Sequence, residues 1–200
     1  MAVKIVLASS NPGKLAEFQA LASGNSITIE LGLMPNLESI PPFDESALTF
    51  AENSLGKALY YSGYSQELML ADDSGLVVPS LGGRPGVHSA RYTGENATSA
   101  QRIEKLLEEM KEKRGEEWEA HFVCALSLVR GARALSVITA RTDGQILESR
   151  RGAGGFGYDP IFFFLPLSKT FAELSPAEKN LHSHRGKAFR RLLEVLPGML

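Results

Sequence analysis

The sequence predicts an α/β protein in which helices flank a mixed central sheet, and three observations lead to this fold class. Short apolar runs alternate with segments whose apolar residues recur at helical spacing. The middle of the chain contains longer alternating runs that are typical of a β-hairpin. The 200 residues, of which 44% are hydrophobic and 22% charged, suit one globular domain over residues 1–200.

In the first half of the chain, the pattern predicts short strands separated by two helices. The first helix begins at Asn11 and Pro12, because Asn is a favourable N-cap and Pro suits the first helical position. The second helix begins at the capping box of Thr49 and Glu52. Strands are expected over 3–8, 27–31 and 68–71, extended structure resumes at 76–78, and a proline-rich loop covers 32–47.

The second half begins with a long loop over 82–98, and a helix follows from the capping box of Thr98 and Gln101. Ser175 and Glu178 form another capping box, from which one continuous last helix is expected. Strands are expected over 118–129, 133–141, 145–150 and 161–165.

Composition excludes several classes of protein. The net charge of −2 argues against a dedicated nucleic-acid binder, although a local basic cluster would suffice for a small anion. Cys124 is the only cysteine, so no disulfide forms within the chain, and its apolar neighbours indicate a buried structural thiol. The N-terminal apolar run is too short for a signal peptide and no segment approaches a membrane span, so we expect a cytoplasmic location without membrane contact.

The first candidate motif lies at the predicted turn from the first strand into the first helix. Backbone N–H groups and the helix dipole attract phosphate there, and Lys14 adds a positive charge. The segment is not a Walker A loop, and the alternative is an ordinary capped helix with a surface lysine. The candidate phosphate-binding residues are Ser9, Ser10, Asn11, Pro12, Gly13 and Lys14.

Adjacent carboxylates, Asp72 and Asp73, follow the apolar strand over 68–71. Because neighbouring strand residues point to opposite faces, the two should have different roles. One could hold Mg²⁺ or orient an attacking water, while the other braces a turn. The alternative is that the segment 72–75 is only a turn, since Asp, Ser and Gly are typical turn residues. Glu45 or Glu52 could complete a Mg²⁺ site; we favour Glu45, because Glu52 is already explained by its capping box.

Glycines and aromatic residues combine in the segment 154–160, where close backbone approach and stacking would suit a base. The alternative is a tight turn whose aromatic residues cover the core. Further along, Lys179 near a helix start, and His184 and Arg185 near the middle of the expected last helix, could bind an anionic ligand. No His/Cys spacing indicates zinc, and no nucleophile elbow indicates a serine hydrolase.

Taken together, these segments resemble the inosine triphosphate pyrophosphatases, also described as deaminated-purine nucleoside triphosphate pyrophosphatases. The likeness runs essentially end to end; where a typical member begins the first motif with Thr, Ser9 keeps the hydroxyl. The matching segments are 7–14, 48–53, 71–76, 89–92, 154–162 and 183–186.

The resemblance implies Mg²⁺-dependent cleavage of ITP, dITP or XTP to the monophosphate and pyrophosphate, by a homodimer whose active site lies in a cleft between two lobes. It makes Asp73 the general base and a metal ligand, with Glu45 as second ligand. Residues 9–14 would hold the triphosphate. The remaining substrate contacts it implies are Ser74, Phe156, Gly157, Tyr158, Asp159, Lys179, His184 and Arg185. A pyrophosphatase for other nucleotides, a non-catalytic nucleotide sensor and a phosphatase releasing orthophosphate remain alternatives.

Overall fold

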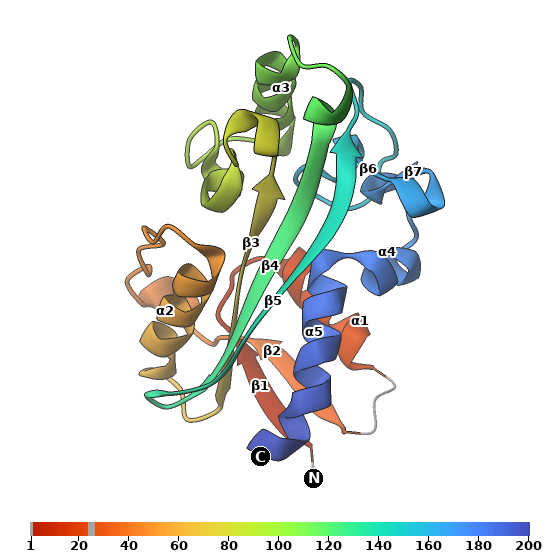
Figure 1. Ribbon diagram of the computed structural model, residues 1–200. Coiled ribbons are helices and arrows are strands. Elements are labelled where there is room, and N and C mark those ends of the chain that lie inside the picture. The colour runs from red at the N-terminus through yellow and green to blue at the C-terminus, as the bar shows by residue number, and fades with distance from the viewer. Residues whose placement is uncertain (1, 24–26) are drawn as a thin grey trace. The chain divides into compact units, whose positions relative to one another are not determined.

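The computed structural model describes residues 2–23 and 27–200, and it has the predicted α/β architecture (Figure 1). Within these residues, seven strands form one sheet in the order β2-β1-β3-β4-β5-β6-β7. The strands are β1 (Val3–Leu7), β2 (Ile29–Leu33), β3 (Leu68–Val77), β4 (Glu119–Arg130), β5 (Arg133–Ile146), β6 (Phe162–Phe164) and β7 (Lys169–Thr170). The α-helices are α1 (Pro12–Ala22), α2 (Phe50–Ser62), α3 (Ser99–Met110), α4 (Pro176–His182) and α5 (His184–Val195).

The sheet is mixed, as predicted. Strand β1 pairs in parallel with both β2 and β3, so that Leu7 lies opposite Leu33 on one side and Leu70 on the other. Strand β6 pairs antiparallel with β5 and with β7. Parallel strands need crossover connections, and α1 provides the crossover from β1 to β2.

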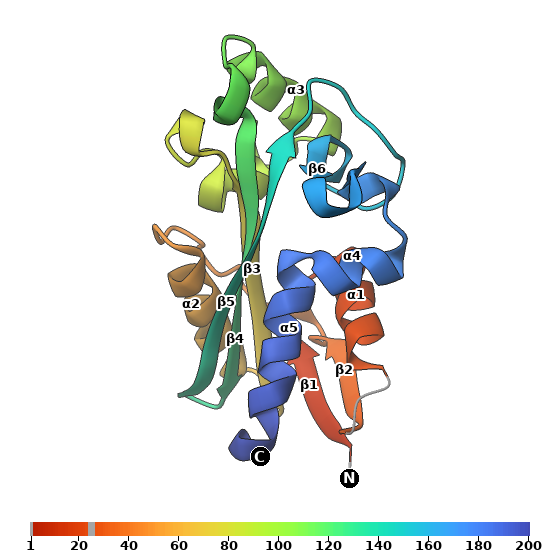
Figure 2. The ribbon, with the colours of Figure 1, turned by 45° about the vertical axis from the view of Figure 1, so that its right-hand side comes forward.

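The chain divides into two compact units, each with its own core. The first unit comprises the described parts of 1–73, together with 124–140 and 184–200. In this unit α1 and α5 cover one sheet face, where Phe18 and Phe189 pack with ring centroids 5.2 Å apart. Helix α2 covers the other face through Ala58 and Tyr61, and the views in Figures 1 and 2 show these helices on opposite sides of the strands.

The second unit comprises 74–123 and 141–183. Its core is aromatic: the Phe162 ring lies 4.6 Å from that of Phe122 and 4.8 Å from that of Phe171, between centroids. The buried face of α3 packs into the same cluster through Ile103 and Leu106. The expectation of a single functional domain over 1–200 remains a prediction.

The helix starts agree with the capping signals. Asn11 accepts from the N–H groups of Gly13 and Lys14, and Pro12 occupies the first turn. Both partners of the capping boxes at Thr98 and at Ser175 are bonded as expected. These side chains satisfy N–H groups that have no partner inside the helix.

Several element boundaries were predicted wrongly. The second strand begins two residues later, at Ile29, and β5 continues to Ile146 instead of giving way to a new strand over 145–150. The last helix is broken at Ser183, whose extended backbone (φ −70°, ψ 159°) separates α4 from α5. No helix among the described residues is long and apolar enough to cross a membrane.

Candidate functional site

Asp72 and Asp73 lie within a continuous strand and not at a turn, which corrects the expectation from sequence. Strand β3 runs from Leu68 through both carboxylates to Val77. Because successive residues of a strand face opposite ways, the two side chains meet different partners. The strand geometry therefore supports different roles for Asp72 and Asp73, although neither side chain stabilises a turn.

Asp72 is the centre of a buried ionic cluster in the first unit. Its Oδ2 lies 2.8 Å from Lys14 Nζ and 3.2 Å from Arg185 Nε, and its Oδ1 accepts from the Cys124 thiol at 3.3 Å. The Arg185 Nη1 also reaches Glu17 Oε2 at 3.1 Å. Burial alone would raise the pKa of Asp72, but the charges of Lys14 and Arg185 outweigh burial and hold that pKa well below its ordinary value. Asp72 is therefore a permanent anion that fixes two cations.

Asp73 has a contrasting environment. The residue is 7% exposed, and its Oδ2 is buried without a hydrogen-bond partner. Burial raises its pKa to about 6; the negative charges of Glu45 and Asp72 add to this, while Lys14 and a hydrogen bond from Asn53 oppose it. A carboxylate that titrates near neutrality and keeps one free oxygen is suited to accept a proton from water.

Glu45, the second predicted metal ligand, forms an ion pair with Lys57 of α2 at 2.5 Å. The loop that carries it is tied to α2 by Asn53, which accepts from the Ala47 N–H at 2.9 Å and donates to the Ala47 carbonyl at 3.3 Å. Asn53 and Lys57 were not predicted as site residues, although Asn53 belongs to the matching segment 48–53. The capping box predicted for Thr49 and Glu52 is only half formed. The Thr49 Oγ1 accepts from the Glu52 N–H at 3.2 Å, but the Glu52 carboxylate accepts from the Thr49 hydroxyl at 2.7 Å and not from the Thr49 backbone N–H.

The metal donor set in the first unit is small. Across residues 2–23 and 27–200, no three His, Cys, Asp or Glu side chains gather closely enough to bind a metal. Asp73 and Glu45 together supply two carboxylates, one of them with a buried free oxygen. This set fits Mg²⁺, which is commonly bound by one or two carboxylates with water and substrate phosphates completing its shell.

The predicted phosphate turn is a capped helix start. Ser9 is buried and its Oγ accepts from the Asn11 N–H at 3.1 Å. The N–H groups of Gly13 and Lys14 are capped by Asn11, so the phosphate-binding character of this turn depends more on Lys14 than on those two amides. The Lys14 side chain is 17% exposed, and its ion pair with Asp72 fixes the orientation of the ammonium group.

In the second unit, Asp159 organises the glycine-rich loop. Its Oδ2 accepts from the Phe156 N–H at 2.8 Å and from Lys179 Nζ at 2.7 Å. The Lys179 ammonium in turn lies 4.9 Å from the centroid of the Phe156 ring. Gly155 has φ +69°, and a Cβ there would lie 2.1 Å from Asp159 Oδ2. The predicted residues of this loop and Lys179 are thus brought together.

Tyr158 is placed differently from Phe156. It is 3% exposed, belongs to the aromatic core of the second unit, and its hydroxyl donates to the Ser89 carbonyl at 3.1 Å. Burial raises its pKa well above the ordinary value. Of the two aromatic residues expected to stack on a base, the half-buried Phe156 keeps that possibility, whereas Tyr158 supports the loop.

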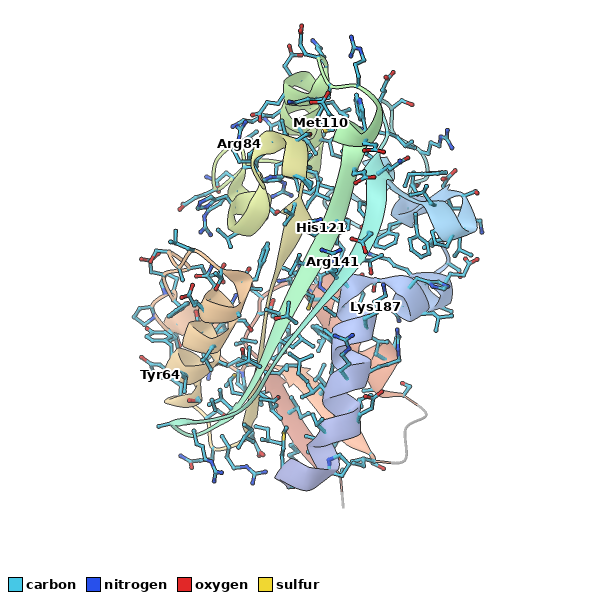
Figure 3. All side chains as sticks on the ribbon, in the orientation of Figure 1. Tyr64, Arg84, Met110, His121, Arg141 and Lys187 are labelled. Carbon is cyan, nitrogen blue, oxygen red and sulfur yellow. The ribbon has the colours of Figure 1, made fainter. Side chains whose placement is uncertain are left out.

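The remaining predicted residues fall in separate units, each described by itself. His184 and Arg185 belong to the first unit and are buried at the start of α5, not in the middle of a longer helix. Ser74 belongs to the second unit. His121 lies on β4 near Arg141 of β5 (Figure 3), and burial and the arginine charge lower its pKa.

This fold and site define an α/β protein in which a buried carboxylate with a raised pKa lies near a lysine-bearing strand-to-helix turn, a class suited to phosphate chemistry. Over residues 5–195 the chain matches the model of the Ham1 family, and it belongs to this family. The resemblance predicted from sequence is thereby confirmed.

Relatives support this membership along the whole chain. The dITP/XTP pyrophosphatase of Geobacillus kaustophilus (strain HTA426) is 46% identical over 191 residues, covering 96% of this chain and 93% of the relative. That of Desulfotalea psychrophila is 42% identical, covering 98% and 86%. The solved structure of a HAM1 protein from Coxiella burnetii superposes with a TM-score of 0.85 at 40% identity, covering 98% and 99%. The Staphylococcus aureus Ham1 protein gives 0.85 at 35% identity, covering 98% of each chain.

Proposed function

We propose that this protein hydrolyses the deaminated purine nucleoside triphosphates ITP, dITP and XTP to the monophosphate and pyrophosphate, which removes them from the nucleotide pool. The observation that carries the proposal is Asp73, a buried carboxylate with a pKa of about 6 and a free oxygen. The chain that carries Asp73 is 46% identical to the dITP/XTP pyrophosphatase of Geobacillus kaustophilus, which supports the proposal.

Lys14 is the proposed contact of the triphosphate, with Ser9, Ser10, Asn11, Pro12 and Gly13 shaping the turn that presents it. Attack on a phosphorus atom is opposed by the negative charge of the surrounding oxygens, and a fixed cation lowers that opposition. Asp72 holds the Lys14 ammonium at 2.8 Å, so the lysine side chain has little conformational freedom left to lose when substrate binds.

Asp73 and Glu45 are the proposed ligands of Mg²⁺, which when bound would offset the charge of the phosphate oxygens. Lys57 pairs with Glu45 at 2.5 Å and compensates the charge of that carboxylate. Mutual repulsion between Asp73 and Glu45, which contributes to the raised pKa of Asp73, is the kind of strain that a bound cation relieves.

Asp73 is also the proposed general base. It would accept a proton from the water that attacks one of the two phosphorus atoms sharing the α–β bridging oxygen. The bond from that phosphorus to the bridging oxygen then breaks, which separates monophosphate from pyrophosphate. A base with a pKa near 6 is largely ionised at neutral pH yet still basic enough for this transfer.

The proposed contacts of the purine ring are Phe156, which would stack on it, and hydrogen-bond donors that recognise its 6-oxo group. In the second unit the proposed contacts are Ser74, the backbone of Gly157 and Lys179, which Asp159 holds at 2.7 Å, while Tyr158 supports the loop. In the first unit they are His184 and Arg185, and Arg185 or a loop N–H is the proposed donor to the 6-oxo group. Adenine presents an amino group where hypoxanthine presents an oxygen, so a donor aimed at that position would be left unpaired by ATP.

The decisive experiment measures pyrophosphate and orthophosphate released from ITP, XTP, GTP, ATP and dTTP, with Mg²⁺ and with EDTA. The proposal expects pyrophosphate from ITP and XTP only when Mg²⁺ is present, and little from the other nucleotides. Release of orthophosphate would indicate a phosphatase, and preference for dTTP would indicate a different base pocket. Binding of ITP without turnover would indicate a nucleotide sensor.

The proposal also includes a homodimer located in the cytoplasm, without a nucleic-acid or membrane partner. The net charge of −2 supports the absence of nucleic-acid binding. Light scattering at micromolar concentration measures the dimer, and a molecular mass near that of one chain of 21.7 kDa would contradict it.

A further inference from the structure

Ser89, in a segment to which no role has yet been given, joins two parts of the second unit that the proposed function uses. Its Oγ accepts from the Leu76 N–H at 2.8 Å and donates to the Gly86 carbonyl at 2.7 Å. Its own carbonyl accepts from the Tyr158 hydroxyl at 3.1 Å. The residue is 6% exposed, so these bonds are shielded from water.

On one side, Ser89 fixes the strand that follows Asp73. Gly75 approaches it so closely that a Cβ would lie 2.4 Å from Ser89 Oγ and 2.5 Å from the Gly86 carbonyl oxygen. Only a residue without a side chain allows this approach. Residues 74–76 are therefore held against the Ser89 segment by contact as well as by a hydrogen bond.

On the other side, Ser89 fixes the loop proposed to bind the base. Tyr158 is anchored by the Ser89 carbonyl, and the next residue, Asp159, holds both the Phe156 N–H and the Lys179 ammonium. A displacement of Tyr158 would thus move the stacking ring and the charged donor together.

We propose that Ser89 is a positioning residue that sets the place of Ser74 relative to the loop 156–159 and thereby the selection of the purine base. The inference rests on the proposed function. Rejection of ATP requires donors held in fixed positions, because a mobile donor can move away from an amino group that offers it no acceptor. Loosening Ser89 should therefore cost discrimination more than it costs turnover.

The test compares Ser89→Ala, Tyr158→Phe and the double variant. Ser89→Ala removes the Oγ, and Tyr158→Phe removes the hydroxyl while keeping the ring in the core. We expect each single variant to lower the ratio of kcat/KM for ITP over ATP by about tenfold, the equivalent of about 1.4 kcal/mol. The effect should appear mainly in KM for ITP. The double variant should lose little more than either single one, because both act through one connection.

Ser62→Ala is the matched control. Ser62 is 5% exposed and its hydroxyl also donates to a backbone carbonyl, that of Gly131 at 2.5 Å, outside the proposed site. The control should lower Tm without changing the ITP-over-ATP ratio.

The outcomes separate the inference from the function on which it rests. Folded Ser89→Ala and Tyr158→Phe with an unchanged ratio, even at lowered Tm, would make Ser89 purely structural and overturn the inference. An equal loss in Ser62→Ala, or fully additive losses in the double variant, would overturn it as well. If Ser89→Ala does not fold, Tyr158→Phe alone decides through the ratio. Wild-type protein that releases no pyrophosphate from ITP would remove the proposed function, and the inference with it.

Discussion

At the scale of the residue, two adjacent aspartates have opposite electrostatics because their surroundings differ. The cations of Lys14 and Arg185 pair with the ionised Asp72 carboxylate and lower its pKa. Asp73 is buried, no ion pair to it is found among the described residues, and Glu45 is a neighbouring acid, so its pKa rises to about 6 although Lys14 opposes the rise. One side chain supplies a fixed charge, and the other supplies an oxygen able to take a proton.

Asp73→Asn should abolish turnover and yet stabilise the protein above pH 6. An acid whose pKa is raised on folding favours the folded state when protonated, so its contribution is full below about pH 4 and is lost as the pH rises through 6. The shift from 3.8 to about 6 corresponds to about 3 kcal/mol at most. Asn mimics the neutral form and avoids this loss.

Urea denaturation of both proteins between pH 4 and pH 8 measures the difference, alongside pyrophosphate release from ITP. The stability gain should shrink towards zero as the pH approaches 4. Near-normal turnover would exclude Asp73 as the base, and a gain independent of pH would exclude its titration as the cause.

Asp72→Asn should have the opposite effect on stability. Removing the anion leaves Lys14 and Arg185 without their shared buried partner, which costs about 3–5 kcal/mol at pH 7. Asp143→Asn is the matched control, because the Arg141–Asp143 pair has side chains 64% and 68% exposed. Such an exposed pair is worth at most about 1 kcal/mol. Equal free energies of unfolding for the two variants, measured in urea, would contradict a structural role for the buried cluster.

At the scale of the element, local signals predicted strands and helix starts, whereas boundaries set by tertiary packing were missed. Asn11 and Thr98 mark the starts of their helices, because their side chains accept hydrogen bonds from backbone N–H groups two or three positions away. The signal at Ser183 is ambiguous: serine is a favourable N-cap and its extended backbone directly precedes α5, but serine also occurs within helices, so the sequence favoured one continuous helix. Ser183 lies at the point where the chain passes from one compact unit to the other.

The candidate site divides in the same way. Each motif was found from its own residues, since glycines, acids and lysines in a short segment carry local meaning. The partners of Asp72 were not, because Lys14 and Arg185 are 58 and 113 positions away in sequence. Only folding brings these charges together, so their effect on the pKa of Asp72 could not be predicted.

The glycine-rich loop provides a prediction about an element. Gly155→Ala should raise KM for ITP by at least about tenfold, because the new Cβ meets Asp159 Oδ2 and displaces the group that holds Lys179 and the Phe156 N–H. Gly131→Ala is the control: it also has positive φ (+55°) but meets no atom within 4 Å. Both variants incur a left-handed backbone cost of about 1 kcal/mol. Steady-state kinetics with ITP should show a change in Gly155→Ala alone, and equal KM values would contradict the role of Asp159.

At the scale of the whole molecule, two cores are built on shared strands. The chain passes from one unit to the other inside β3, β4 and β5, and once more between Ser183 and His184. A strand cannot lose its order in one half without affecting the residues that continue it, so the covalent path favours cooperative unfolding. The two cores are therefore expected to melt together, although each has its own aromatic cluster.

Phe189→Ala in the first unit and Phe171→Ala in the second test this expectation. Both rings are fully buried, and each substitution should cost about 3–5 kcal/mol through lost burial and a cavity. Calorimetry should show one transition in the wild type, and each variant should lower the temperature of that same transition. Two transitions, each moved by only one of the substitutions, would mean that the units unfold independently. Strands that continue from one unit into the other would then be insufficient to couple their unfolding. The loops of the second unit, including the segment held by Ser89, would be stabilised by the core of that unit alone.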